Sequence, residues 1–295
     1  MEEHLSKYIK YIQEKNPKIE INNIHTNLTD GLHNDVVVIN DCDVFRFAKH
    51  DFSKALLFNE YKVLQIVKQF VDMPVPNLEI LDEGVSKYFF IKGRPIFRSN
   101  ILNLHEDLQL QIAEQLGRFL SQLHSIPLST IKENNINAFP GNGTRDSYMD
   151  LYSRIEAKLF PHMKSYVIEC IQNVFRPVFN NPDFLEYIPT LIHGDLAPYH
   201  IIEESNKVIG IIDFGVSGFG DPAHDVGVIL DTLGEGFIKK ISQYYKGIDS
   251  FIDRSRFYAN VSSIRWALIG LESNDVSWHV NHFFTAKEIN PYGKK

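Results

Sequence analysis

The sequence predicts an α+β protein with two lobes, a small β-rich lobe followed by a larger, mostly helical lobe. Two observations carry this prediction. Short β-branched and aromatic runs surround one main helix in the first 93 residues, and apolar residues recur at helical spacing from residue 108 onward. We therefore place the N-terminal lobe at residues 1–93 and the C-terminal lobe at residues 94–295. A groove between two such lobes is a common position for a ligand.

The elements of the first lobe follow from apolar spacing and from the turn residues between the apolar runs. Apolar residues three or four apart predict a helix, and β-branched runs bounded by Asn, Asp, Gly or Pro predict strands. The Asn40-Asp41 pair lies between two such runs and indicates a hairpin. Helices are expected at residues 5–12 and 54–70, an extended stretch at 19–24, and strands at 36–39, 44–48, 78–81 and 88–91.

The second lobe shows mainly the helical period. One β-like segment, residues 191–214, interrupts it and contains the apolar runs Ile201-Ile202 and Ile209–Ile212. The remaining elements are expected to be helices at residues 108–124, 147–156, 166–175, 225–233, 236–245 and 253–271.

Composition excludes several classes of protein. The 295 residues include 30 Lys and Arg against 37 Asp and Glu, a net charge of −7, with no basic tract. This argues against nucleic-acid binding and favours a cationic partner. No apolar run approaches the ~20 residues needed to cross a bilayer, and the acidic start lacks the features of a secretory signal. We expect a cytosolic monomer whose two cysteines, Cys42 and Cys170, are unpaired.

The strongest chemical signal is a pair of motifs, His193-Gly194-Asp195 with His200 five residues after the Asp, and Asp213-Phe214-Gly215. Either tripeptide alone is frequent by chance, and an acid at a strand end often only caps a turn. Together they have the layout of protein kinases. In that layout Asp195 accepts the proton of the attacking hydroxyl, and His200 and Asp213 bind Mg²⁺. A loop histidine bonded to the main chain is the alternative for His200.

This segment resembles the signature of the aminoglycoside phosphotransferase family, small-molecule kinases related in fold to protein kinases. It is most similar to the aminoglycoside 2''-phosphotransferases, with the macrolide phosphotransferases next. Their loops carry histidine where protein kinases carry asparagine, and His200 matches that form. The resemblance implies a protein-kinase-like fold, Mg²⁺ as cofactor and ATP or GTP as phosphate donor.

The same resemblance implies a set of nucleotide-binding residues. Arg46 stands where the family usually has a lysine that holds the α- and β-phosphates, and Glu60 matches the glutamate that pairs with that cation. The segment Phe90-Ile91-Lys92 resembles the hinge that contacts the purine, Ile212 precedes the metal-binding Asp, and residues 30–35 correspond to the turn over the phosphates. The alternatives are a solvent-facing carboxylate for Glu60 and a strand end packed in the core for Phe90 and Ile91.

Other residues near these motifs are expected to have supporting roles. Lys49 is expected to be solvated, because alternation along a strand puts it on the face opposite Arg46. His124 is expected to be a buried, hydrogen-bonded histidine, and His193 to orient the catalytic loop. Asp221 and Asp225 are expected to be structural, capping helices or holding that loop.

An aminoglycoside is a polycation, so carboxylates should line its pocket. The candidates in the helical lobe are Asp231, Glu235, Glu272 and Asp275, with ordinary exposed helix charges as the alternative. The 2''-phosphotransferases carry a denser acidic run, and an acid where this chain has Val216. Aromatic side chains suited to a macrolide or a sugar are Trp266, Trp278 and Phe237.

These motifs indicate a kinase that transfers the γ-phosphate of ATP or GTP to a hydroxyl of a small molecule. An antibiotic, first of all an aminoglycoside, is the expected acceptor. A macrolide or another hydroxylated metabolite is the alternative substrate. A catalytically silent, kinase-like nucleotide sensor is the alternative of another class. All of these depend on Asp195 and Asp213 lying close together between the lobes.

Overall fold

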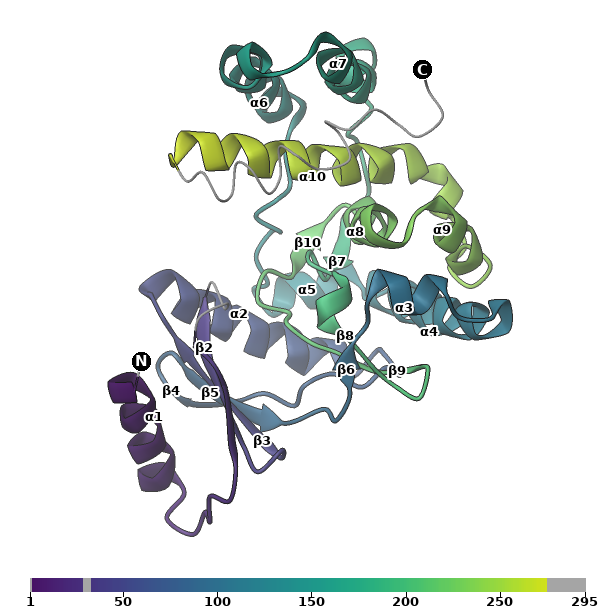
Figure 1. Cartoon of the computed structure of the whole chain (residues 1–295). Helices are drawn as coiled ribbons and strands as arrows, with labels where there is room; N and C mark the ends of the chain where they lie inside the picture. Colours follow the sequence, from purple (N-terminus) through teal and green to yellow (C-terminus); the bar gives the residue numbers. More distant parts are fainter. Residues whose placement is uncertain (1, 29–32, 275–295) are drawn as a thin grey trace.

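The computed structural model describes residues 2–28 and 33–274, and it has two lobes (Figure 1). The N-terminal lobe is an antiparallel sheet in the order β1-β2-β3-β5-β4, with helices α1 (Glu2–Lys15) and α2 (Asp51–Val67). Its strands are β1 (Ile24–Asn27), β2 (Asn34–Ile39), β3 (Asp43–Ala48), β4 (Glu79–Asp82) and β5 (Val85–Phe89). The central strand, β3, pairs with β2 on one side and with β5 on the other.

The predicted hairpin is confirmed as β2 and β3. Asn40 and Asp41 both have positive φ, 57° and 50°, which these two residue types tolerate better than other side chains. The hairpin places four consecutive residues of β3, Val44 to Phe47, in buried positions. Arg46 is therefore held inside the sheet, with only 7% of its surface exposed.

The C-terminal lobe is mostly helical, as predicted. Its helices are α3 (Arg98–Leu102), α4 (Glu106–His124), α5 (Leu128–Glu133), α6 (Arg145–Lys158), α7 (Ser165–Asn180), α8 (Ala223–Leu233), α9 (Glu235–Ile241) and α10 (Ile252–Glu272). Two small antiparallel sheets lie among them. One contains β6 (Arg94–Pro95), β8 (Ile201–Glu204) and β9 (Lys207–Ile211), and the other contains β7 (Thr190–Ile192) and β10 (Gly218–Gly220).

The predicted elements are present, with shifted ends and some additions. The helix expected at 54–70 starts and ends three residues earlier, and the strand expected at 88–91 lies at Val85–Phe89. The single β-like segment is divided into β7, β8 and β9. The sequence did not predict α3, α5, β6 or β10, because elements of two to six residues are too short to show a period.

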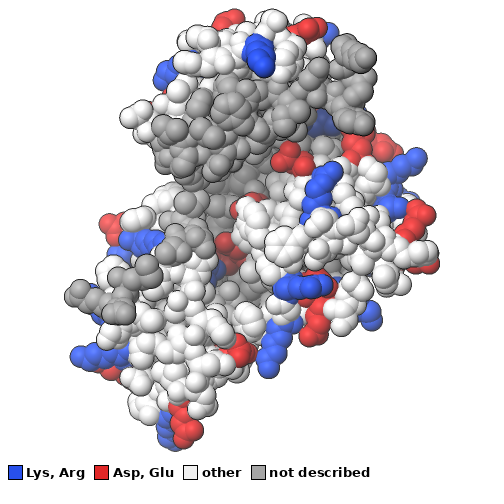
Figure 2. Space-filling view, in the orientation of Figure 1, with Lys and Arg blue, Asp and Glu red and all other residues white. Residues whose placement is uncertain are grey.

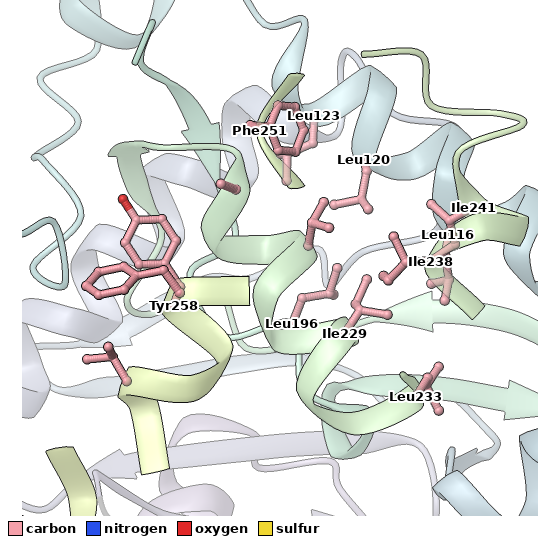
Figure 3. Close-up of a cluster of buried hydrophobic side chains, with 14 of the residues drawn as sticks. Leu116, Leu120, Leu123, Leu196, Ile229, Leu233, Ile238, Ile241, Phe251 and Tyr258 are labelled. Atoms are coloured by element: carbon pink, nitrogen blue, oxygen red, sulfur yellow. The ribbon is translucent and has the colours of Figure 1, made fainter. Parts of the chain in front are cut away.

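A continuous apolar core connects α4, α8 and α9, and Figure 3 shows part of it. Leu196, which follows Asp195 directly, is fully buried in this core with Leu120 and Ile229. Burial of Leu196 thus fixes the loop of residues 193–200 to the helices beneath it. None of the helices in the described residues is long and apolar enough to cross a membrane. Cys42 and Cys170 are free and exposed, which confirms the prediction that they are unpaired.

Replacing Leu196 by alanine should lower the free energy of unfolding by about 2–5 kcal/mol, because it leaves a cavity in a closed core. Urea denaturation followed by circular dichroism measures this. The control is Ile188→Ala, which truncates a side chain that is 85% exposed and should change stability by less than about 0.5 kcal/mol. Equal losses in the two variants would show that Leu196 does not anchor the loop.

Candidate active site

The site is built on a buried ion pair between β3 and α2. Arg46 Nη1 donates to Glu60 Oε2 at 2.6 Å, and the side chains are only 9% and 0% exposed. The predicted ion pair is confirmed, and the alternative of a solvent-facing Glu60 is wrong. Burial lowers the pKa of Arg46, but Glu60 and Asp213 outweigh burial and raise it overall. Burial raises the pKa of Glu60, and the guanidinium of Arg46 opposes that rise.

This pair also contacts the loop that follows β9. Arg46 Nη2 lies 3.6 Å from Asp213 Oδ1, and the main-chain N–H of Phe214 donates to Glu60 Oε1 at 3.1 Å. Asp213 itself has a positive φ of 67°. One strand and one helix of the N-terminal lobe therefore hold a loop of the C-terminal lobe.

The two motif carboxylates converge on His200. Nε2 of His200 lies 3.3 Å from Asp213 Oδ2, and Nδ1 lies 2.8 Å from the carbonyl oxygen of Asp195 and 3.6 Å from its carboxylate. The alternative, a histidine bonded to the main chain, therefore holds for Nδ1 of His200, whereas Nε2 faces the Asp213 carboxylate. Burial lowers the pKa of His200, but the hydrogen bond and charge of Asp213 outweigh it and raise the pKa overall.

The environments of the two aspartates push their pKa values in opposite directions. Burial raises the pKa of Asp195. Burial acts in the same sense on Asp213, but His200 and Arg46 lower its pKa well below the ordinary value. Both carboxylates remain accessible, at 42% and 45% side-chain exposure. A base that accepts a proton and a carboxylate that stays ionised beside a cation require this kind of separation.

Asp225 holds the start of the loop of residues 193–200. Its carboxylate accepts hydrogen bonds from the main-chain N–H groups of His193 and Gly194, both at 2.8 Å, and contacts His124 Nε2 at 3.0 Å. The other nitrogen of His124 contacts Tyr245 at 2.8 Å. The structural roles predicted for Asp225 and His124 are therefore confirmed.

The other two supporting residues also behave as predicted. Asp221 accepts from the N–H of Ala223 at 3.0 Å and from Arg254 Nε at 2.6 Å. His193 Nε2 contacts the Ile212 carbonyl at 3.0 Å, and Nδ1 accepts from the Asp195 N–H at 3.2 Å. His193 thus connects the two motif loops. Burial lowers its pKa.

The predicted hinge residues lie in the connection from β5 to β6. Phe90 donates its N–H to the Cys42 carbonyl at 2.7 Å, and Phe90 and Ile91 are half-buried while Lys92 is exposed. The alternative of a strand end buried in the core does not hold. The N–H of Ile212 donates to the His200 carbonyl at 3.0 Å, so this residue positions the loop through its main chain.

Two further expectations concern the start of β2 and the end of β3. Half of the turn expected over the phosphates, residues 30–32, lies outside the described residues. The expectation that Lys49 is solvated is wrong, because Lys49 pairs with Asp35 at 3.3 Å and its side chain is only 21% exposed. Lys49 follows the last residue of β3, so alternation along the strand no longer fixes its direction.

The candidate substrate acids differ in their surroundings. Glu235 pairs with Arg256 at 2.6 Å, and Glu272 pairs with Lys158 at 2.8 Å and with Arg154. Asp231 is exposed on α8, and Trp266 is 38% exposed on α10. Phe237 is 1% exposed, so the suggestion that it lines a substrate pocket is wrong. Asp275 and Trp278 lie outside the described residues.

Sequence reasoning missed Tyr199, Asn59 and Ser217. The Tyr199 ring is 57% exposed and packs edge-on against His200 with centroids 4.4 Å apart. Burial and the negative charges of Asp195 and Asp213 raise the pKa of Tyr199 to about 12. The sequence did contain one indication for Tyr199, which is its position between Asp195 and His200. Asn59 and Ser217 show no sequence pattern of their own.

The residues present fit a magnesium ion that is shared with a nucleotide. Mg²⁺ usually takes one or two carboxylates from the protein and its other oxygens from phosphate and water. Asp213 supplies one accessible carboxylate, and the described residues contain no cluster of three or more ligating side chains that would form a complete cage. Figure 2 shows the molecule hollowed between its lobes, with acidic side chains visible in the hollow.

Acid should destabilise the protein partly through Asp225. Its pKa in the folded protein is lowered from 3.8 by His124 and by main-chain N–H groups, despite burial. As the pH falls below about 4, the Asp225 carboxylate is therefore protonated in the unfolded chain before it is protonated in the folded protein. The free energy of unfolding falls as a result. Asp225→Asn should cost about 2 kcal/mol at pH 7, and its deficit relative to wild type should shrink as the pH falls through the folded pKa.

Urea titrations at a series of pH values from 7 to 3 measure this difference. Asp249→Asn, at an exposed position, is the matched control and should follow the wild-type curve. A deficit for Asp225→Asn that stays constant over the whole range would contradict an ionised, hydrogen-bonded Asp225.

Comparisons with known proteins agree with this geometry. The chain is 25% identical over 196 residues to an aminoglycoside 3'-phosphotransferase of Escherichia coli, covering 65% of this chain and 66% of the relative's length. A solved GDP and kanamycin complex of APH(2'')-IIIa is 24% identical, with a TM-score of 0.82 and coverage of 94% and 96%. Macrolide 2'-phosphotransferase MphH from Brachybacterium faecium is 16% identical, with a TM-score of 0.67 and coverage of 98% and 99%.

The solved structures share the fold of both lobes, which confirms the predicted protein-kinase-like architecture. The model of the phosphotransferase enzyme family, APH, matches residues 25–258. That range contains the Arg46–Glu60 pair, the loop of residues 193–200 and the Asp213 loop. The chain therefore belongs to the phosphotransferase enzyme family, as the two motifs had predicted.

Proposed function

We propose that this protein is a Mg²⁺-dependent kinase that transfers the γ-phosphoryl group of ATP or GTP to a hydroxyl of an antibiotic, with aminoglycosides as the first substrate class. The observation that carries the proposal is the convergence of Asp195 and Asp213 on His200, beside the Arg46–Glu60 pair. We place the reaction in the cytosol, with the protein acting as a monomer and without nucleic acid.

Each residue has a role that its surroundings support. Arg46 contacts the phosphates, since a guanidinium can donate two parallel hydrogen bonds to phosphate oxygens. Asp213 and His200 are the residues that would hold Mg²⁺, which would supply neutralisation of charge on the phosphate oxygens. Ile212 and the hinge at residues 90–92 contact the base.

The reaction itself needs one proton acceptor. The oxygen of the acceptor hydroxyl forms a bond to the γ-phosphorus while the bond from that phosphorus to the bridging oxygen breaks. The hydroxyl proton passes to Asp195, whose raised pKa makes it a better base than an ordinary aspartate. Alignment and charge neutralisation supply most of the catalysis, because the transition state is loose.

A macrolide is the second candidate acceptor, and a specific observation favours it. Two of the four candidate acids for a polycation, Glu235 and Glu272, are already paired with arginine or lysine. A substrate with a single positive charge requires fewer acidic contacts. The silent-sensor alternative lacks such support, because the residues needed for transfer lie together.

Asp195→Asn should lower kcat by at least about 100-fold and leave the KM for nucleotide within about threefold, because a general base acts mainly in the transition state. The measurement is nucleotide consumption with Mg²⁺ and either ATP or GTP, across aminoglycosides, macrolides and simpler alcohols. Asp183→Asn, at an exposed position, is the control and should match wild type.

Three outcomes are informative. Stimulation by one antibiotic class, lost in Asp195→Asn, supports the proposal and names the class. Wild-type turnover by Asp195→Asn would remove the role assigned to that residue. Nucleotide binding without turnover, whatever acceptor is supplied, would favour the sensor.

A further inference from the structure

Asn59 makes hydrogen bonds that have no role in the reaction proposed above. It precedes Glu60 on α2, and its side-chain amide nitrogen donates to the carbonyl oxygens of Gly215 and Ser217, at 3.2 and 2.9 Å. Asn59 is 9% exposed. A buried side chain of the N-terminal lobe is thus bonded to the main chain directly after the Asp213-Phe214-Gly215 motif.

The loop that Asn59 holds is bonded on its other side to the catalytic loop. Ser217 Oγ donates to the His193 carbonyl at 2.8 Å, and the Ser217 N–H donates to the Phe214 carbonyl at 3.1 Å. Glu60 accepts from the Phe214 N–H at 3.1 Å. Adjacent residues of α2 therefore fix adjacent parts of residues 214–217.

Asp213 depends on such support. Its side chain is 45% exposed, so packing does not hold it. Its backbone has a positive φ of 67°, a conformation that is uncommon for residues other than glycine. Arg46 and His200 contact its carboxylate, and the main chain on either side fixes the backbone from which that carboxylate projects. Ile212 is bonded to His200 before it, and Asn59 and Glu60 hold the residues after it.

Asparagine suits this role chemically. Two carbonyl oxygens require two N–H donors at one point, and a side-chain amide supplies them. Aspartate would replace the donors with acceptors, and leucine would keep the size without any donor. Asn59 Oδ1 is buried and has no hydrogen-bond partner in the described structure, so the donor function is the one in use.

We propose that Asn59 is a positioning residue that holds the carboxylate of Asp213 in place for a nucleotide-bound divalent cation, by anchoring the carbonyls of Gly215 and Ser217 to α2. This inference rests on the proposed function, because it assigns Asp213 to metal binding. Partners that orient a metal ligand typically change metal affinity by about 10- to 100-fold when they are removed.

The test measures binding of Mn²⁺, as a probe for Mg²⁺, in the presence of a non-hydrolysable ATP analogue, using electron paramagnetic resonance. Asn59→Leu should weaken Mn²⁺ binding by about 10-fold or more. Asn59→Gln keeps both donors and should lie closer to wild type. Asn59→Ala replaces Asn59→Leu if the latter does not fold. The same variants should require more Mg²⁺ for half-maximal rate in the kinase assay.

Lys62→Ala is the matched control. Lys62 is also on α2 and also donates to a main-chain carbonyl of the C-terminal lobe, but its acceptor is Asn135, at 2.7 Å, and not a residue of the 213–217 segment. It should leave Mn²⁺ binding unchanged. Equal Mn²⁺ affinity in wild type and Asn59→Leu would overturn the role of Asn59 alone. Absence of Mn²⁺ binding in the wild-type nucleotide complex would overturn the metal site and the proposed function with it.

Discussion

The buried pair of Arg46 and Glu60 is the constraint on which the rest of the site depends. Removing two charges from water is costly, and the cost is met only when both find partners. Arg46 meets Glu60 and Asp213, and Glu60 also accepts from the Phe214 N–H. These partners come from both lobes, so satisfying the buried charges also sets how the N-terminal lobe faces the Asp213 loop.

The helical lobe supplies the opposite kind of support, which is apolar packing beneath the loop of residues 193–200. Leu196 is buried among α4, α8 and α9, and Asp225 accepts the N–H groups at the start of the same loop. Asp195 lies between these two anchors with its side chain partly exposed. The loop is thus anchored to the helices on both sides of Asp195 and accessible at the Asp195 side chain.

Much of the fold and of this site could be predicted from the sequence. The two motifs identified Asp195, His200 and Asp213, and position within the pattern identified the Arg46–Glu60 pair. The contacts of Asn59 and Ser217 could not be predicted, because they join residues more than 150 positions apart or bond only to main-chain carbonyls. Lys49 was misjudged because it lies just beyond the strand whose alternation was applied to it.

For the choice of substrate, the acids counted in the sequence and the ion pairs of the folded protein lead to different expectations. Counting acids along the helical lobe treats every carboxylate as available to a cation, but Glu272 is shared between Arg154 and Lys158. A polycationic acceptor that bound at Glu272 would have to compete with those side chains, whereas a less charged one would not. Which acids are already paired within the protein is a property of the folded surface that composition does not contain.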